Sequence, residues 1–133
     1  YPIAGGTKLS DLLNAPGALG PSPYTPFGII VRKDTKTLIR QLEAFTPVAV
    51  LNGHEDKTLQ SDDVVRVLSV SPGVVDSAFV PGRGADFNAK TAATTPLGRI
   101  GTTDDIAAAV EACATSLRFA TGTRIVVDGG RHL

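Results

Sequence analysis

Val65-Arg66-Val67-Leu68-Ser69-Val70-Ser71-Pro72-Gly73 is the stretch that decides the fold of this 133-residue chain. Its β-branched residues predict a buried strand, which the Pro-Gly pair ends. Downstream, Thr102 followed by Asp105 has capping-box spacing and predicts a helix start. Residues 124–130 predict a second, non-alternating strand, and this pattern is typical of a parallel sheet covered on both faces. The helix between them repeats apolar residues at a period of 3.6, namely Ile106, Ala109, Val110, Cys113 and Leu117.

The first half of the chain predicts a smaller unit built from short elements. Thr7 is the expected N-cap of a short helix. Residues 27–32 and 38–45 predict the two strands of a hairpin, and residues 47–51 predict a short helical or irregular connection before the Asn52-Gly53 turn. The order strand, helix, hairpin, connection and strand suits a small β-grasp unit.

Composition excludes several classes of function. The 13 Lys and Arg residues balance 13 Asp and Glu residues, so the chain lacks the basic surplus of a nucleic-acid-binding protein. Its apolar runs are far too short to span a bilayer. The single Cys113 allows neither an internal disulfide nor a Cys-based zinc site. Because the chain starts at Tyr1 and contains no methionine, we expect a processed product or an excised or engineered piece.

Residues 64–133 resemble the C-terminal part of the short-chain dehydrogenase/reductase family. The resemblance rests on five motifs: Ser71-Pro72-Gly73-Val74-Val75, Pro96-Leu97-Gly98-Arg99-Ile100-Gly101, Asp104-Asp105-Ile106-Ala107, Thr121-Gly122 and Val126-Val127-Asp128-Gly129-Gly130. One departure is Leu68, where the family usually has Asn.

The reductase resemblance implies a binding role for one loop. Pro72, Gly73 and Val75 would lie beside the nicotinamide of NAD(P), and Ser77 would stand where a threonine usually contacts the carboxamide or the pyrophosphate. Residues 79–95 would form a mobile substrate loop. The extreme C-terminus would pack in a dimer or tetramer interface, as it often does in this family.

Residues 1–69 resemble the soluble-ligand-binding β-grasp domain of polysaccharide export proteins. The resemblance begins with Tyr1-Pro2-Ile3-Ala4-Gly5-Gly6-Thr7 and Leu9-Ser10-Asp11-Leu12-Leu13. It continues with Phe27-Gly28-Ile29-Ile30, Ala49-Val50-Leu51-Asn52-Gly53 and Leu59-Gln60-Ser61-Asp62-Asp63-Val64-Val65-Arg66-Val67. In that family the module binds or braces and performs no chemistry.

The two resemblances together predict a composite fold class. A small α+β unit, β-grasp-like and spanning residues 1–63, is followed by residues 64–133, the C-terminal strand-helix-strand portion of a Rossmann-like α/β fold. Residues 64–69 would serve both as the last strand of the β-grasp unit and as the strand before Ser71-Pro72-Gly73. Because the two resemblances meet at this shared strand, we hypothesise that the chain is a chimera. An uninterrupted reductase sequence upstream of residue 64 in the parent gene would contradict that hypothesis.

The parts that a reductase of this family needs for catalysis are missing from the sequence. A dinucleotide requires a Gly-rich turn that opens a helix, and Gly5-Gly6 lacks the family's spacing. The family also uses a Tyr-x-x-x-Lys pair, in which the lysine lowers the tyrosine pKa. Four residues after Tyr1 and Tyr24 stand Gly5 and Gly28, so neither tyrosine forms the pair. We therefore predict no catalytic residue in this chain.

The remaining polar residues indicate structural roles. His54 and His132 are predicted to be isolated surface residues that hold no metal. Asp128 is expected to close a tight turn rather than act as a base. Arg83 and Lys90 could meet an anionic substrate in a complete enzyme, although solvated loop charges are commoner.

The sequence supports two functional interpretations. The first is a non-catalytic chimera of an export-type binding or scaffold module and an incomplete reductase. The alternative is a fragment of an NAD(P)-dependent short-chain oxidoreductase whose cofactor-binding and catalytic half is missing. Either way, no cofactor is expected for the chain alone, and NAD(P) is expected once a missing half completes it. Self-association or a complementing chain is expected because the sheet would be incomplete. The reductase-like half implies cytoplasm and the export-like half implies periplasm, so the compartment stays open.

Overall fold

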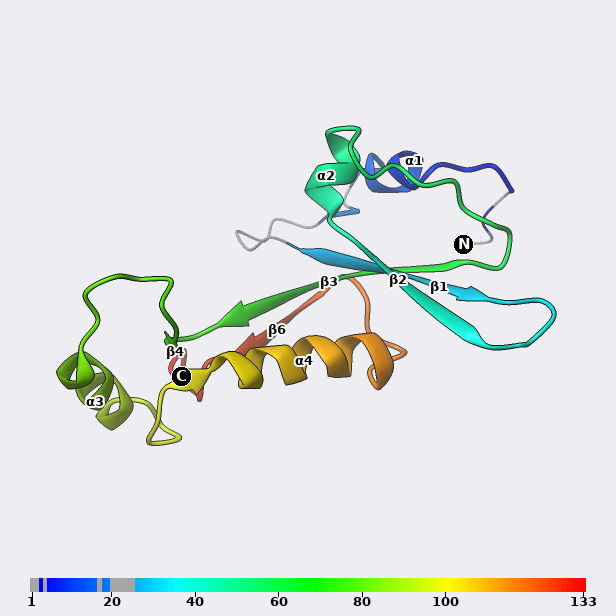
Figure 1. Ribbon diagram of the computed structural model, residues 1–133. Coiled ribbons are helices and arrows are strands. Elements are labelled where there is room, and N and C mark those ends of the chain that lie inside the picture. The colour runs from blue at the N-terminus through cyan, green and yellow to red at the C-terminus, as the bar shows by residue number, and fades with distance from the viewer. Residues whose placement is uncertain (1–2, 4, 17, 20–25) are drawn as a thin grey trace. The chain divides into compact units, whose positions relative to one another are not determined.

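The computed structural model describes residues 3, 5–16, 18–19 and 26–133 and divides the chain into two compact units (Figure 1). Unit 1 comprises residues 1–69 and 118–123, and unit 2 comprises residues 70–117 and 124–133. Tyr1 and Tyr24, neither of which forms a Tyr-x-x-x-Lys pair in the sequence, lie outside the described residues. The assignment of residues 1–63 and 64–133 to two different families stays a prediction.

Unit 1 contains two short helices. The first, α1, spans Leu9–Leu13, and its N-cap is Lys8 rather than the predicted Thr7. The Thr7 carbonyl oxygen accepts the Leu59 N–H at 2.8 Å, which keeps Thr7 paired with a distant loop instead of the helix. The second helix, α2, spans Pro47–Leu51 and confirms the helical alternative for the predicted connection. Pro47 starts α2 with a preset φ angle and no unsatisfied N–H.

A hairpin forms the outer part of the sheet in unit 1. Strand β1, Phe27–Lys33, pairs antiparallel with β2, Arg40–Phe45, which confirms the first predicted strand. The second strand begins two residues later than predicted because the turn is longer. The Asp34 carboxylate accepts the N–H groups of Lys36 and Thr37 at 2.8 and 2.7 Å, and Leu38 adopts a left-handed φ of 59°.

The core of unit 1 lies between this sheet and the two helices. Strand β3, Val64–Pro72, pairs antiparallel with β1, from Phe27 opposite Leu68 to Val31 opposite Val64. The Phe45 ring covers Gly28, where an added Cβ would lie 1.9 Å from the ring. Buried apolar residues from both helices, both hairpin strands and the loop before β3 make up the core, namely Leu9, Leu13, Ile30, Phe45, Val50 and Leu59.

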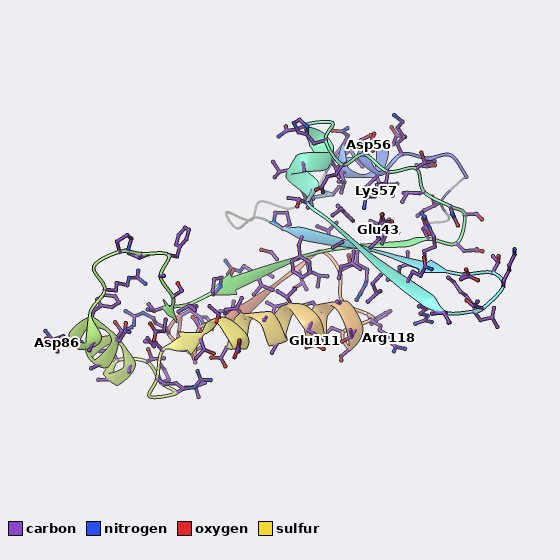
Figure 2. The ribbon with its side chains drawn as sticks, viewed as in Figure 1. Glu43, Asp56, Lys57, Asp86, Glu111 and Arg118 are labelled. Atoms are coloured by element: carbon purple, nitrogen blue, oxygen red, sulfur yellow. The ribbon has the colours of Figure 1, made fainter. Side chains whose placement is uncertain are left out.

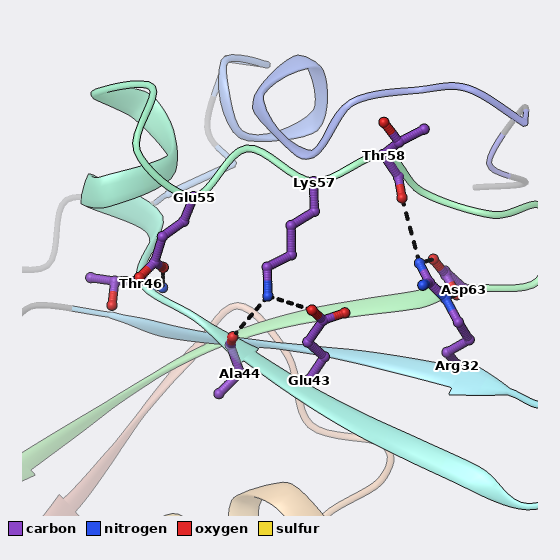
Figure 3. Close-up of polar contacts among 8 residues, drawn as sticks. All are labelled: Arg32, Glu43, Ala44, Thr46, Glu55, Lys57, Thr58 and Asp63. Atoms are coloured by element: carbon purple, nitrogen blue, oxygen red, sulfur yellow. Dashed lines mark hydrogen bonds and ion pairs between the residues drawn. The ribbon is translucent and has the colours of Figure 1, made fainter.

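Polar side chains fix the loop between α2 and β3 over the hairpin. Arg32 donates two hydrogen bonds to Asp63, from Nε at 2.8 Å and from Nη2 at 2.6 Å (Figure 3). Lys57 contacts Glu43 at 2.6 Å, and Figure 2 shows that pair close to Asp56. Asp56 in turn accepts the Ser10 N–H and hydroxyl at 3.0 and 2.9 Å. These contacts tie the loop to β1, β2 and α1.

Unit 2 contains the elements that follow the Pro-Gly pair. Strand β4, Val75–Asp76, pairs in parallel with β5, Gly101–Thr102, and helix α3 spans Ala85–Ala93 between them. Helix α4, Thr103–Thr115, follows, and the structure confirms its predicted capping box. The Asp105 N–H donates to Thr102 Oγ1 at 3.2 Å, and the Thr102 N–H donates to Asp105 Oδ2 at 2.7 Å. Strand β6, Thr123–Val127, ends the fold.

The four-stranded sheet has the order β2-β1-β3-β6, so β3 has a neighbour on each side. Within unit 2 the end of β3 lies beside β6, and the Gly73 N–H donates to the Val127 carbonyl oxygen at 3.0 Å. Both arrows point the same way in Figure 1, as the sequence pattern predicted for a parallel pair.

The prediction that this sheet is covered on both faces is wrong for β6. Its residues are only half-buried or exposed, because the described part of the chain supplies too little apolar surface to cover them. The predicted apolar face of α4 is covered only in part: Cys113 is fully buried, whereas Val110 is 38% exposed and Leu117, at 41%, lies beyond the helix end. None of the helices in the described part of the chain has the length and apolarity that a bilayer crossing needs.

Candidate functional site

The four predicted binding residues lie in unit 2, between the end of β3 and the residue that follows β4. Pro72 is the last residue of β3 and is exposed. Val75 lies in β4, where it is half-buried and stands opposite Gly101. Ser77 follows β4 and is exposed. The Gly101 N–H donates to the Val74 carbonyl oxygen at 2.9 Å, so the loop is anchored to the start of α4.

Gly73 is the most constrained of these four residues. A Cβ built on it would lie 2.6 Å from the Asp128 Cβ and 2.7 Å from the Asp128 Cα. The second of these atoms belongs to the backbone and cannot move aside. Glycine is therefore required at position 73 by the packing of two loops within unit 2, whatever else the position does.

Asp128 closes the turn after β6, as predicted. Its carboxylate accepts the Gly130 N–H at 2.9 Å and the His132 N–H at 3.0 Å. Burial favours the neutral acid, but these bonds and the contact with the His132 ring outweigh burial and hold the pKa of Asp128 below its usual value. The prediction that His132 is isolated is wrong, because its Nδ1 lies 2.9 Å from Asp128 Oδ2.

A second charged pair lies at the start of α4. Arg99 donates from Nη1 and Nη2 to the two carboxylate oxygens of Asp105, at 2.6 and 2.9 Å. These bonds, with those from Thr102, hold the pKa of Asp105 far below its usual value. The two charges neutralise each other, and Asp105 also caps α4.

A cavity of about 390 Å³ lies between these two pairs within unit 2. None of the four predicted binding residues lines it, although Gly101 and Asp128, which neighbour Val75 and Gly73, do. Sequence reasoning missed this cavity, and the nearest available signals were the capping box at Thr102 and the glycines after Asp128. It is lined by Leu97, Arg99, Gly101, Asp105, Val126, Val127, Asp128, Gly129, Gly130 and His132.

The predicted substrate loop, residues 79–95, contains helix α3 and one exposed aromatic residue. Phe79 is 90% exposed, whereas the Arg83 guanidinium lies 4.9 Å from the centre of the Phe87 ring. Arg83 therefore has a neighbour within its own loop. The Asn88 side chain donates to Asp76 at 3.3 Å and ties α3 to β4.

The described residues do not form a complete cofactor or metal site. Among them, no group of three or more His, Cys, Asp or Glu side chains could hold a metal ion. Gly5 and Gly6 precede the short helix α1 and follow no described strand, so they do not form a phosphate-binding turn between a strand and a helix. The described residues therefore lack the phosphate-binding turn that a dinucleotide requires.

Comparison with known proteins identifies the family. Residues 59–132 match the family model described as enoyl-(acyl carrier protein) reductase, which is more than half of the chain. The chain therefore belongs to this family of short-chain dehydrogenases/reductases.

Two curated relatives and one solved structure illustrate the likeness. The putative ketoacyl reductase 2 of the granaticin polyketide synthase of Streptomyces violaceoruber is 38% identical over 96 residues, which cover 65% of this chain and 37% of that protein. Cis-4-hydroxycyclohexanecarboxylate dehydrogenase of Sinomonas cyclohexanicum is 37% identical over 67 residues, covering 50% and 27%. A short-chain dehydrogenase of Leptospira borgpetersenii with bound NAD+ is 32% identical, with a TM-score of 0.44, covering 51% and 26%. The chain thus spans well under half the length of these proteins.

Replacing Gly73 by alanine is expected to lower the free energy of unfolding by about 1–3 kcal/mol, because the new methyl group overpacks against the Asp128 backbone. Urea denaturation followed by circular dichroism measures the effect. The matched control is Gly5→Ala, where an added Cβ meets nothing within 4 Å. Equal stabilities for the two variants would show that the packing at Gly73 is looser than described.

Proposed function

We propose that this chain is the C-terminal part of an NAD(P)-dependent short-chain oxidoreductase and that it performs no catalysis alone. The observation that carries the proposal is the family match over residues 59–132 combined with the loop from Pro72 to Ser77. In this proposal the loop contributes the nicotinamide side of the cofactor site. A preceding segment supplies the phosphate-binding turn and the Tyr-Lys pair.

One feature of the comparisons favours this reading over a join at residue 64. The alignment with the Streptomyces violaceoruber reductase covers 65% of the chain, which is more than residues 64–133 can supply. The likeness to reductases therefore extends into residues that the chimera hypothesis assigns to an export-type module. The export-type β-grasp module remains a prediction that these observations do not support.

When NAD(P) is bound in the complete enzyme, it supplies hydride transfer. The role proposed for this chain is to position and shield the nicotinamide. Gly73 brings the loop against Asp128, and the pairing of β4 with β5 holds Val75 against Gly101. Ser77 lies at the exposed end of the loop, where its hydroxyl can hydrogen-bond an incoming cofactor.

A hybrid enzyme tests the proposal. Residues 59–132 replace the matching C-terminal segment of the Streptomyces violaceoruber reductase, and NADH or NADPH oxidation is followed with a ketoacyl thioester. We expect activity within about 10²-fold of the parent, since small misplacements of a catalytic site cost that much. A hybrid that folds, by circular dichroism, but shows no oxidation would contradict the proposal.

Two variants of the hybrid localise the effect. Ser77→Asp places a negative charge where the pyrophosphate or carboxamide is expected, and it should raise the KM for the cofactor about tenfold. Glu111→Gln on the exposed side of α4 is the matched control and should leave KM unchanged.

A further inference from the structure

We infer that β1 occupies the edge of β3 at which the rest of a reductase sheet would join. In this inference the hairpin occupies that edge in the chain as it stands, and the preceding segment of the proposed complete enzyme can pair with β3 only after displacing the hairpin. The inference rests on the proposed function only for the identity of β3 as a reductase strand. Doubly wound sheets are built from parallel strands, whereas β1 runs antiparallel to β3.

Both edges of β3 are occupied within unit 1 itself. On one edge, the Val67 N–H donates to Thr121 Oγ1 at 3.2 Å, and the Val67 carbonyl oxygen accepts the Gly122 N–H at 2.8 Å. On the other edge lies β1, with Gly28 opposite Val67. Because the backbone groups of Val67 face residues 121–122, strand alternation turns those of Arg66 and Leu68 toward β1.

The core holds β1 in this position. Ile30 of β1 is fully buried in the unit 1 core, and Val65 and Val67 of β3 pack against that core. Ile29, the next residue of β1, is 3% exposed. Removing β1 from the edge would therefore expose apolar side chains as well as backbone groups. A loosely attached edge strand would not be buried in this way.

One side-chain contact fixes an end of the β1–β3 pairing. Arg32 of β1 forms its two hydrogen bonds with Asp63, the residue before β3. The register of β1 on β3 cannot slide without breaking this contact. An incoming parallel strand would have to displace it.

Hydrogen exchange of the intact chain tests the inference, because amides on one strand report opposite edges. We expect the Arg66, Val67 and Leu68 amides to be protected to within about tenfold of one another. Unprotected Arg66 and Leu68 amides beside a protected Val67 amide would show an open edge and overturn the inference. Loss of protection at all three would also overturn it. Neither readout depends on cofactor or activity, so failure here is distinct from failure of the hybrid enzyme.

A cross-strand disulfide gives an independent measurement. Val31 stands opposite Val64, which is 54% exposed, and paired strand positions lie within disulfide range. Under mild oxidation the Val31→Cys/Val64→Cys chain should form a disulfide within one chain, whereas Val31→Cys/Val48→Cys should not. The native Cys113 is fully buried. Cross-links that form only between chains would show that β1 does not lie on its own β3.

Discussion

Replacing Arg32 by alanine is expected to lower the free energy of unfolding by about 3 kcal/mol, because it leaves the Asp63 carboxylate buried without its cation. The Asp63 side chain is 1% exposed and that of Arg32 is 28% exposed. The remaining hydrogen bond, from the Gln60 N–H at 2.9 Å, keeps the loss at the lower end of the range for broken buried pairs. Urea denaturation near neutral pH measures the difference.

The matched control is Lys57→Ala, which removes the half-buried partner of the exposed Glu43 (Figure 3) and should cost less than about 1 kcal/mol. If both variants lose the same stability, the Arg32–Asp63 pair is not buried as described. The dependence on pH gives a second check. Arg32 lowers the pKa of Asp63, so the pair contributes fully above the unfolded pKa of about 3.9 and less as the pH falls through the folded pKa. The gap between the wild-type chain and Arg32→Ala should therefore shrink in acid.

Replacing Ile30 by alanine is expected to lower the free energy of unfolding by about 2–5 kcal/mol, the usual range for a fully buried isoleucine. Ile30 is 0% exposed at the centre of the unit 1 core. The variant loses the transfer free energy of the deleted methyl and methylene groups, and it also loses stability because the surrounding residues cannot fill the cavity left behind. Thermal and urea denaturation of the variant measure it.

Ile39→Ala is the matched control for this variant because it makes the same chemical change at a residue that is 62% exposed. Its effect should stay within about 0.5 kcal/mol. A small loss at Ile30 would contradict the described core, and with it the argument that the core holds β1 on β3.

Elements that depend on neighbouring residues could be predicted from the sequence. The capping box at Thr102 and Asp105 is set within a single turn and was confirmed. A short helix was one of the two alternatives predicted for residues 47–51, and the structure shows it starting at Pro47. Thr7 looked like an N-cap by the same local rule, but its carbonyl oxygen bonds Leu59 far along the chain. Leu38 could not be anticipated either, since a left-handed leucine is rare and depends on the Asp34 turn around it.

In the candidate site, too, features set by neighbouring residues could be predicted and contacts between distant residues could not. The loop from Pro72 to Ser77 was predicted as a binding site from short motifs that can be read in the sequence itself, and its binding role stays a prediction. The close approach of Gly73 to Asp128 joins residues that are distant in the chain, and no local pattern reports it. The Asp128–His132 pair was missed although its spacing is short, because the strand ends at Val127 and the turn beyond it has no regular period.

Strand β3 constrains how this sequence can change over evolution. Its residues belong to one unit up to Ser69 and to the other from Val70 onward, and its two edges face β1 and β6. A single-residue insertion or deletion anywhere in it would reverse both faces downstream, turning core side chains outward and exchanging the partners of every following amide. Changes in its length would therefore survive only in steps of two. Because β3 contributes residues to both units, a change in its length affects the packing of both at once.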